Sequence, residues 1–286
     1  MGDYGDLMEL SPRSARGDGL QAIVLDVDGT LVDSERDGHR VAFNRAFEEA
    51  GLPARWDVER YGELLEVTGG QRRIDAHYEQ QGVPAEEREN LARRLHVRKT
   101  EIFTEMARRG EIAPRAGVNE LLDALQDAGV RLAVATTGST AWVHPLLDRL
   151  FGRDRFEAVV TGDESPRLKP DPGAHRVALE RLALMPDAAV AVEDSRNGLL
   201  AAKSAGLACV VVVNDYTRGQ DFDDADLVLD GFGDAQLPAS VLADPHRLDP
   251  PGRLDVETLR RLAGSGSADR RRLQSQARRR RARRKQ

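Results

Sequence analysis

The sequence has a single cysteine, Cys209, among its 286 residues, so no disulfide can form within the chain. Cys209 opens the apolar run 209–213, which predicts a buried strand residue rather than a nucleophile. No apolar stretch approaches the roughly 20 residues that a membrane helix needs. The N-terminal residues lack the apolar run of a secretory signal. These absences argue against a secreted or membrane-spanning protein, and we expect a cytoplasmic one.

Basic residues are scarce in the body of the chain and concentrated at its end. Residues 270–286 hold nine Arg and one Lys with no acid, and setting these aside leaves a formal charge of −16 for residues 1–269. An acidic body argues against an enzyme that acts on nucleic acid. The basic tail is the candidate contact for RNA, a membrane surface or an acidic partner, although we expect a solvated, disordered end.

The hydrophobic pattern changes twice along the chain. After a Gly-, Ser-, Arg- and Asp-rich segment, 1–19, that we expect to be a flexible tail, residues 21–26 read as a buried strand. Residues 36–109 then show helical periodicity and no convincing strand. From Pro114 onward, strands alternate with helices. The strand candidates are 131–136, 156–160, 188–192, 208–213 and 226–229, and the helix candidates are 36–50, 61–65, 72–81, a long one after Pro84, 117–128, 140–150, 172–184, 197–205 and 255–262.

This alternation predicts an α/β fold with a parallel sheet covered by helices on both faces. Such sheets bind their ligands at the carboxyl ends of the strands. The residues that follow each strand candidate are therefore the place to look for chemistry.

The first strand ends in Asp26-Val27-Asp28-Gly29-Thr30. Residues two apart face the same side of a strand, so Asp26 and Asp28 leave its end together. The pair suits a divalent metal with oxygen ligands, or a carboxylate nucleophile beside an acid/base. Asp and Gly are also common in ordinary turns, and the segment begins like a calcium loop. Taken alone, the motif leaves these interpretations open.

Three further strand ends carry polar residues. Thr136-Thr137-Gly138-Ser139 is a natural phosphate cradle, although Ser139 could simply cap a helix. Lys169 precedes a stiff Pro-x-Pro segment and could neutralise phosphate charge. Glu193 and Asp194 follow a buried apolar run, where charges need a partner, and a metal shared with the first motif would be one.

In this order, the four groups match the motifs of the haloacid dehalogenase-like hydrolases, and the helical insert resembles that superfamily's four-helix cap. The resemblance implies a Rossmann-like parallel sheet core with an inserted four-helix cap domain. The bounds that follow are 20–34 and 113–232 for the core, 35–112 for the cap, 233–268 for a C-terminal extension and 269–286 for the basic tail.

The cap narrows the resemblance. The segments 61–65 and 67–70, followed by Arg73-Ile74, look like those of CbbY-type sugar-bisphosphate phosphatases linked to the Calvin cycle. So do 33–35 and the residues around 215–217. The resemblance implies xylulose 1,5-bisphosphate, an inhibitor of rubisco, as substrate. Gln71 departs from the pattern, because many relatives carry a Lys after the paired glycines, and this leaves the exact sugar open.

The resemblance also implies roles. Asp26 is the nucleophile that becomes an aspartyl-phosphate, and Asp28 is the acid/base. Mg²⁺ is held by the Asp26 carboxylate, the Asp28 carbonyl and Asp194, with Glu193 close by. The transferring oxygens are held by Thr136 and Lys169, together with the N–H groups of Thr137 and Gly138.

The cap residues should select the substrate. The candidates are Glu35, His39, Thr68, Gly69, Gly70 and Arg73. Glu35 would bind a sugar hydroxyl, and Arg73 would clamp a distal phosphate. His39 could equally be a packed or solvated residue, and Arg73 one more surface arginine.

Three other functions stay open at this point. A phosphomutase like β-phosphoglucomutase or a phosphoglycolate-type phosphatase would share the fold, and a non-catalytic member could use its basic tail to bind a partner. We expect a monomer that binds a small sugar phosphate and contacts neither membrane nor nucleic acid.

Overall fold

A seven-stranded sheet forms the centre of the computed structural model, which describes residues 19–65, 67 and 69–264. Its strand order is β3-β2-β1-β4-β5-β6-β7, and every neighbouring pair is parallel except β6 and β7. The strands are β1 (Ala22–Leu25), β2 (Arg131–Ala135), β3 (Phe156–Val160), β4 (Ala189–Glu193), β5 (Ala208–Val212), β6 (Leu227–Leu229) and β7 (Val241–Ala243).

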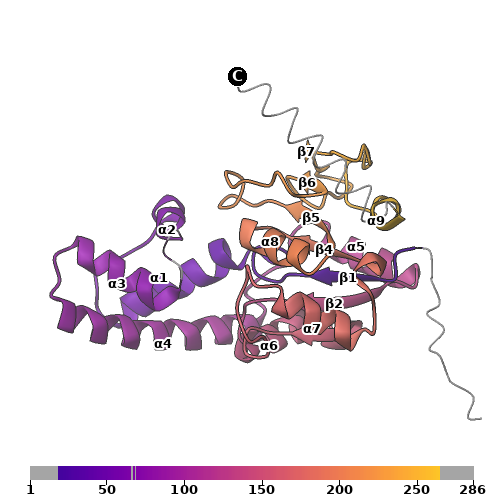
Figure 1. The fold of residues 1–286 in the computed structure, drawn as a ribbon. Coiled ribbons are helices and arrows are strands. Elements are labelled where there is room, and N and C mark those ends of the chain that lie inside the picture. Colours follow the sequence, from indigo (N-terminus) through magenta and orange to yellow (C-terminus); the bar gives the residue numbers. More distant parts are fainter. Residues whose placement is uncertain (1–18, 66, 68, 265–286) are drawn as a thin grey trace, which may run out of the picture.

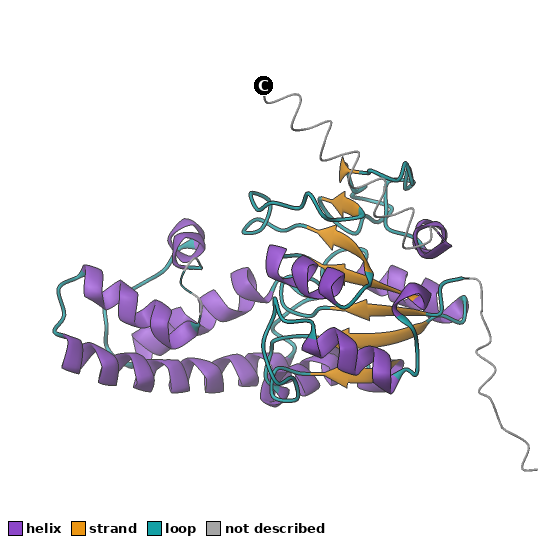
Figure 2. Cartoon of the chain, in the orientation of Figure 1, coloured by secondary structure: helices purple, strands orange, loops and turns teal. Residues whose placement is uncertain are grey.

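Helices cover both faces of the sheet (Figure 2). Alternate residues of β1 enter different cores: Ile23 and Leu25 join one cluster, and Ala22 and Val24 join the other. The first cluster includes α5 (Val118–Asp127), α6 (Thr140–Leu150) and α9 (Val256–Gly264). The second includes α7 (Gly173–Arg181) and α8 (Arg196–Ser204), and the short turns η2 (Arg153–Arg155) and η3 (Pro186–Ala188) precede β3 and β4.

The insert between β1 and α5 lies beyond the carboxyl edge of the sheet (Figure 1). It consists of a π-helical turn, η1 (Glu35–His39), and the helices α1 (Arg40–Glu49), α2 (Val58–Leu64), α3 (Gly70–Gln80) and α4 (Ala85–Arg109). Phe43, Phe47 and Trp56 are fully buried and form its aromatic centre. The two connections to the sheet lie side by side, because Val32 bridges to Pro114.

The predicted α/β fold with an inserted four-helix cap is confirmed, and the predicted strands lie within a residue or so of the observed ones. Cys209 is buried in β5 as expected. Three details differ. The helix predicted over 36–50 begins as a π-helical turn, and the helix predicted to reach 184 ends at 181, before Ala183 with a positive φ of 51°. The antiparallel strand β7 was not predicted, because it is short and half exposed.

The predicted tails, 1–19 and 269–286, lie outside the described residues except for Gly19. Among the helices in the described part of the chain, none is both long and apolar enough to cross a membrane.

Candidate active site

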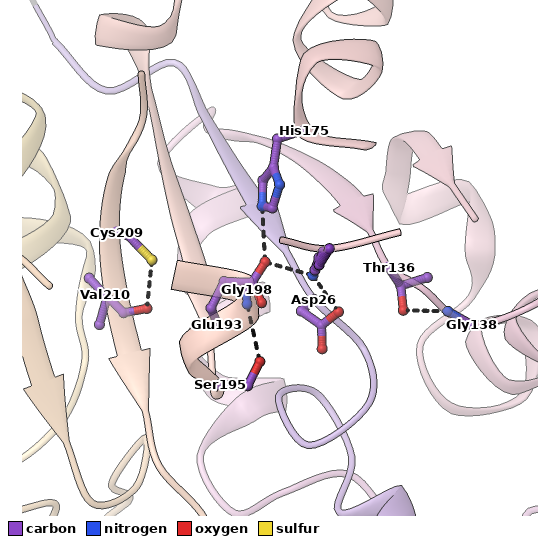
Figure 3. Close-up of polar contacts among 10 residues, drawn as sticks. Asp26, Thr136, Gly138, His175, Glu193, Ser195, Gly198, Cys209 and Val210 are labelled. Carbon is purple, nitrogen blue, oxygen red and sulfur yellow. Dashed lines mark hydrogen bonds and ion pairs between the residues drawn. The ribbon is translucent and has the colours of Figure 1, made fainter. Parts of the chain in front are cut away.

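The sheet register brings the motif-bearing strand ends to one edge. Leu25 pairs with Val134 on one side and Val192 on the other, so Asp26, Thr136 and Glu193 follow at nearly the same level. Figure 3 shows Asp26 and Glu193 facing each other there, with Thr136 to one side.

Lys169 lies between two of the carboxylates. Its Nζ donates to Asp26 Oδ1 and to Glu193 Oε1, each at 2.7 Å. All three side chains are at least nine-tenths buried. His175 Nε2 lies 2.9 Å from the same Glu193 oxygen (Figure 3). The Lys169 side chain therefore extends from the Pro-x-Pro segment to the edge of the sheet, where the two carboxylates hold its ammonium beside Asp26.

The pKa values of the three acids near Lys169 shift in different directions. Burial raises the pKa of Asp26 to about 7, against the pull of Lys169. Burial, together with the charges of Asp26 and Glu193, raises the pKa of Asp194 well above its usual range. Burial also acts on Glu193, but Lys169 and His175 outweigh it and lower its pKa. Asp194 Oδ2 accepts a hydrogen bond from the neutral amide of Asn214 at 2.7 Å.

The acid cluster fits a divalent metal. Asp26, Glu193 and Asp194 offer carboxylate oxygens that all lie within 4.8 Å of one another, and oxygen donors suit hard cations. In the described residues, Glu193 Oε2 is buried without a hydrogen-bond partner. Two glycines leave room for these carboxylates: a Cβ at Gly29 would stand 2.3 Å from Asp194 Oδ2, and one at Gly198 would stand 1.9 Å from Glu193 Oε2.

Asp28 has different neighbours from Asp26. The Ser34 hydroxyl donates to its Oδ1, and His39 Nε2 lies 3.3 Å from its Oδ2. Burial favours the neutral acid, but His39 and Ser34 outweigh it and lower the pKa of Asp28. Lys99 Nζ lies 2.8 Å from His39 Nδ1. An ammonium can only donate, so His39 Nδ1 accepts and the ring presents Nε2–H to Asp28.

The turn after β2 carries the residues predicted to cradle a phosphate. Thr136 is buried, and the Gly138 N–H donates to its Oγ1 at 3.1 Å (Figure 3). Thr137 is exposed, and Ser139 precedes α6 without a side-chain capping bond. Ser139 is the N-cap residue of α6, as the alternative interpretation of this turn expected, but its hydroxyl does not make the capping bond. Ser195, by contrast, does cap α8 by accepting the Gly198 N–H.

Apart from His39, the described cap candidates lie in two places: around the Tyr61 hydroxyl and at the start of helix α3. The Tyr61 hydroxyl donates to Glu35, and Arg73 donates to that same hydroxyl and to the Leu64 carbonyl, each at 3.0 Å. Arg73 is only 8% exposed, so much of its guanidinium is used inside the cap rather than at its surface. Gly69, with a φ of +96°, and Gly70 begin α3. Thr68 lies outside the described residues.

A second set of ligand atoms comes together between the core and the cap. Asp28, Glu35 and His39 also lie within 4.8 Å of one another. Their polar partners are already supplied by the chain, through Ser34, Tyr61 and Lys99. The cluster around Asp194 is therefore the better metal site.

Sequence reasoning missed several neighbours of the site. Asn214 follows β5, so the strand-end rule that found Glu193 would also have found it. Arg115 donates to the carbonyl oxygens of Gly29, Val212 and Val213, at 2.6 to 2.9 Å, and joins the first strand end to β5. His175 and Lys99 sit within helices, where nothing in the local sequence marks them.

Comparisons with known proteins identify the family of the chain. Residues 20–206 match the haloacid dehalogenase-like hydrolases. The chain is 44% identical to protein CbbY of Cereibacter sphaeroides over 219 residues, which cover 75% of this chain and 94% of that protein. The crystal structure of CbbY from Rhodobacter sphaeroides in complex with phosphate has a TM-score of 0.62 and 42% identity, covering 74% of this chain and 94% of that one.

A mutant of the same Rhodobacter sphaeroides protein, in complex with xylulose-(1,5)bisphosphate, gives a TM-score of 0.62 and 41% identity over the same shares. The prediction of an enzyme of the phosphatase class is confirmed by these relatives. The fold also agrees with them. The chain belongs to the haloacid dehalogenase-like hydrolases and, within them, to the CbbY-type proteins.

Proposed function

We propose that this chain is a Mg²⁺-dependent phosphatase that hydrolyses xylulose 1,5-bisphosphate through an aspartyl-phosphate on Asp26. One observation carries the proposal: Asp26 and Asp28 leave the same strand end into opposite surroundings. Asp26 contacts Lys169, while Asp28 contacts Ser34 and His39. Paired carboxylates in different environments suit different roles.

In the first step, a carboxylate oxygen of Asp26 attacks phosphorus, and the bond from phosphorus to the sugar oxygen breaks. Asp28 gives its proton to that oxygen. In the protein alone the pKa of Asp28 is lowered, so its carboxyl starts ionised. The negative charge of the bound phosphate would raise this pKa, and Asp28 would then take up the proton that it donates. In the second step, Asp28 accepts a proton from water, whose oxygen attacks phosphorus and releases phosphate and Asp26.

The remaining strand ends would hold the phosphoryl oxygens. Lys169 would supply a fixed positive charge beside Asp26. Thr136, Thr137 and Gly138 would supply hydroxyl and N–H donors at the turn after β2, once the Gly138 N–H exchanges its bond to Thr136 Oγ1 for one to the substrate. Asp26, Asp194 and the Asp28 carbonyl would hold Mg²⁺, with Glu193 close by. Bound there, Mg²⁺ would neutralise charge between the nucleophile and the phosphate.

The cap would select the sugar. Glu35 would accept a sugar hydroxyl, and His39, Gly69 and Gly70 are proposed as further contacts of the sugar. The role of Arg73 as a clamp for the distal phosphate stays a prediction, as do the domain bounds 20–34 with 113–232 and 35–112. The cytoplasmic location, the monomeric state and the link to the Calvin cycle are proposals of the same kind. The substrate is supported by the likeness to the complex with xylulose-(1,5)bisphosphate.

The test is a substrate panel with and without Mg²⁺. The purified chain is incubated with xylulose 1,5-bisphosphate, β-glucose 1-phosphate and 2-phosphoglycolate, and released phosphate is measured together with any hexose 6-phosphate. We expect fast phosphate release from the bisphosphate in Mg²⁺ and none in EDTA.

Three results would replace the proposal. Conversion of β-glucose 1-phosphate to the 6-phosphate with little phosphate release would identify a phosphomutase. Preferred hydrolysis of 2-phosphoglycolate would identify the other phosphatase class. Absence of turnover on every substrate would favour a binding protein.

A further inference from the structure

The loop after β5 contains the segment 215–217, which resembles the CbbY-type proteins. The proposed mechanism gives this segment no role. Its central residue, Tyr216, reaches from the core to the cap. The ring of Tyr216 meets the ring of Tyr61 edge to face, with centroids 5.9 Å apart and planes at 68°. The same ring lies against Gly62, where an added Cβ would stand 3.2 Å from it. Tyr216 therefore packs directly on helix α2.

The base of this loop is fixed to the acid cluster. Asn214 Oδ1 accepts the N–H groups of Tyr216 at 2.9 Å and Thr217 at 3.1 Å, while Thr217 Oγ1 accepts the Asn214 N–H at 3.0 Å. The remaining end of the amide, Nδ2, donates to Asp194 Oδ2 at 2.7 Å. The position of the Tyr216 backbone is thus set by the strand ends of the core.

The cap side of the contact leads to the proposed substrate-binding side chain. Tyr61 is fully buried, and its hydroxyl donates to Glu35. A chain of direct contacts therefore runs from Asp194 through Asn214 and Tyr216 to Tyr61 and Glu35.

We propose that Tyr216 is a positioning residue for substrate selection: its ring fixes Tyr61, and through it Glu35, at the distance from the acid cluster that a sugar phosphate requires. This rests on the proposed function, since it assigns Glu35 to the sugar. The ring matters rather than the hydroxyl, because among the described residues the Tyr216 hydroxyl oxygen has no hydrogen-bond partner.

The experiment compares two substrates. One is the sugar phosphate that the wild type hydrolyses fastest in the panel above, and the other is p-nitrophenyl phosphate, which has no sugar hydroxyl. Tyr216→Ala should lower kcat/KM for the sugar phosphate about tenfold, the size expected for losing an aromatic pair. Its turnover of p-nitrophenyl phosphate should stay within about twofold of wild type.

Two further variants keep the proposal falsifiable if Tyr216→Ala folds poorly. Tyr216→Phe keeps the ring and should match wild type on both substrates. Gly62→Ala disturbs the contact from the cap side, because its added Cβ would stand 3.2 Å from the Tyr216 ring. This variant should repeat the selective loss. Thermal unfolding checks that each variant is folded.

The outcomes separate the two proposals. A wild type that hydrolyses neither substrate contradicts the proposed function. An active wild type whose Tyr216→Ala and Gly62→Ala variants lose both activities equally, or retain both, overturns the positioning role. A Tyr216→Phe variant as impaired as Tyr216→Ala overturns the assignment to the ring.

Discussion

Two buried lysines flank the site, one in the core and one in the cap, and their surroundings are opposite. Lys169 in the core lies between the carboxylates of Asp26 and Glu193, which raise its pKa above the usual range. Lys99 in the cap faces the rings of Phe43 and Phe103, with centroids at 4.9 and 5.3 Å, and burial lowers its pKa to about 8.

The contrast between Lys169 and Lys99 indicates different roles for the core and the cap. In the core, the opposite charges of Asp26 and Glu193 favour the charged form of Lys169, which is the form that a group binding a transferring phosphoryl needs. In the cap, aromatic rings and His39 surround Lys99, and the charges of Glu35 and Asp28 only partly offset the effect of its burial. The core therefore carries fixed electrostatics, whereas the cap carries packing and a charge that can titrate.

We expect the largest effect from a substitution that removes Asp26, the carboxylate partner of Lys169. Asp26→Asn should lower kcat on the preferred sugar phosphate by at least about 10³-fold, because an amide cannot attack phosphorus. Phosphate release measures it, with circular dichroism as the control for folding. If the variant kept wild-type activity, the assignment of the chemistry to the core would fail.

The next effect concerns Asp194, the core carboxylate that Lys169 does not bind. Mg²⁺ at about a hundred times its Kd should stabilise the wild type by about 2.7 kcal/mol and raise its Tm. Asp194→Asn should lose this Mg²⁺ shift and unfold at a higher temperature without metal, since a buried like charge is removed. The matched control is Asp127→Asn at the exposed end of α5, which should keep the shift. A full Mg²⁺ shift in the Asp194 variant would contradict the metal site.

Lys99 predicts a dependence of stability on pH. Its folded pKa, about 8, lies below the unfolded value of 10.5, so the unfolded chain binds more protons between these values and stability rises with pH across that window. Lys99→Met should be more stable than wild type at pH 7 by about 3 kcal/mol, with the difference shrinking from pH 8 to 10.5. Chemical denaturation at several pH values measures it.

The control for that series is Arg94→Met, an exposed position on the same helix, which should leave the pH dependence unchanged. A Lys99 variant whose stability advantage did not fall with rising pH would show that the cap lysine is as firmly charged as the core one.

The smallest effect is expected where core and cap meet at the surface. Asp215 accepts from Arg36 at 3.0 Å, but the two side chains are 59% and 46% exposed. Asp215→Asn should change stability by less than about 1 kcal/mol and kcat/KM by less than twofold, with both differences vanishing in high salt. A loss as large as that of Tyr216→Ala would mean that the ion pair, not the ring, joins the two regions.

Most of the core could be predicted from the sequence, because the physics that places its residues is local and repetitive. Apolar runs of four to six residues with helices between them specify a parallel sheet, and a parallel sheet brings all its carboxyl ends to one edge. Asp26, Thr136, Glu193 and Asp194 come together for that reason, and Asn214 could have been added by the same rule.

The cap was less predictable. Its helices were found by their periodicity, but nothing in a charge-rich helix distinguishes Lys99, which is buried, from Arg98, which is exposed. The bonds of Arg73 to Leu64 and Tyr61 inside the cap could not be read from the sequence, and its proposed role as a phosphate clamp stays a prediction. The π-helical turn at 35–39, which carries both Glu35 and His39, has no signature in the hydrophobic pattern.

The sequence by itself determined the fold class, the family motifs and the edge of the sheet at which chemistry occurs, since strand alternation and residue spacing are properties of short segments. Only the tertiary structure decided which lysine meets carboxylates and which meets aromatic rings, and that Tyr216 of the core touches Tyr61 of the cap. Those contacts join residues more than a hundred positions apart or helices packed against one another, and burial there depends on packing that no local pattern records.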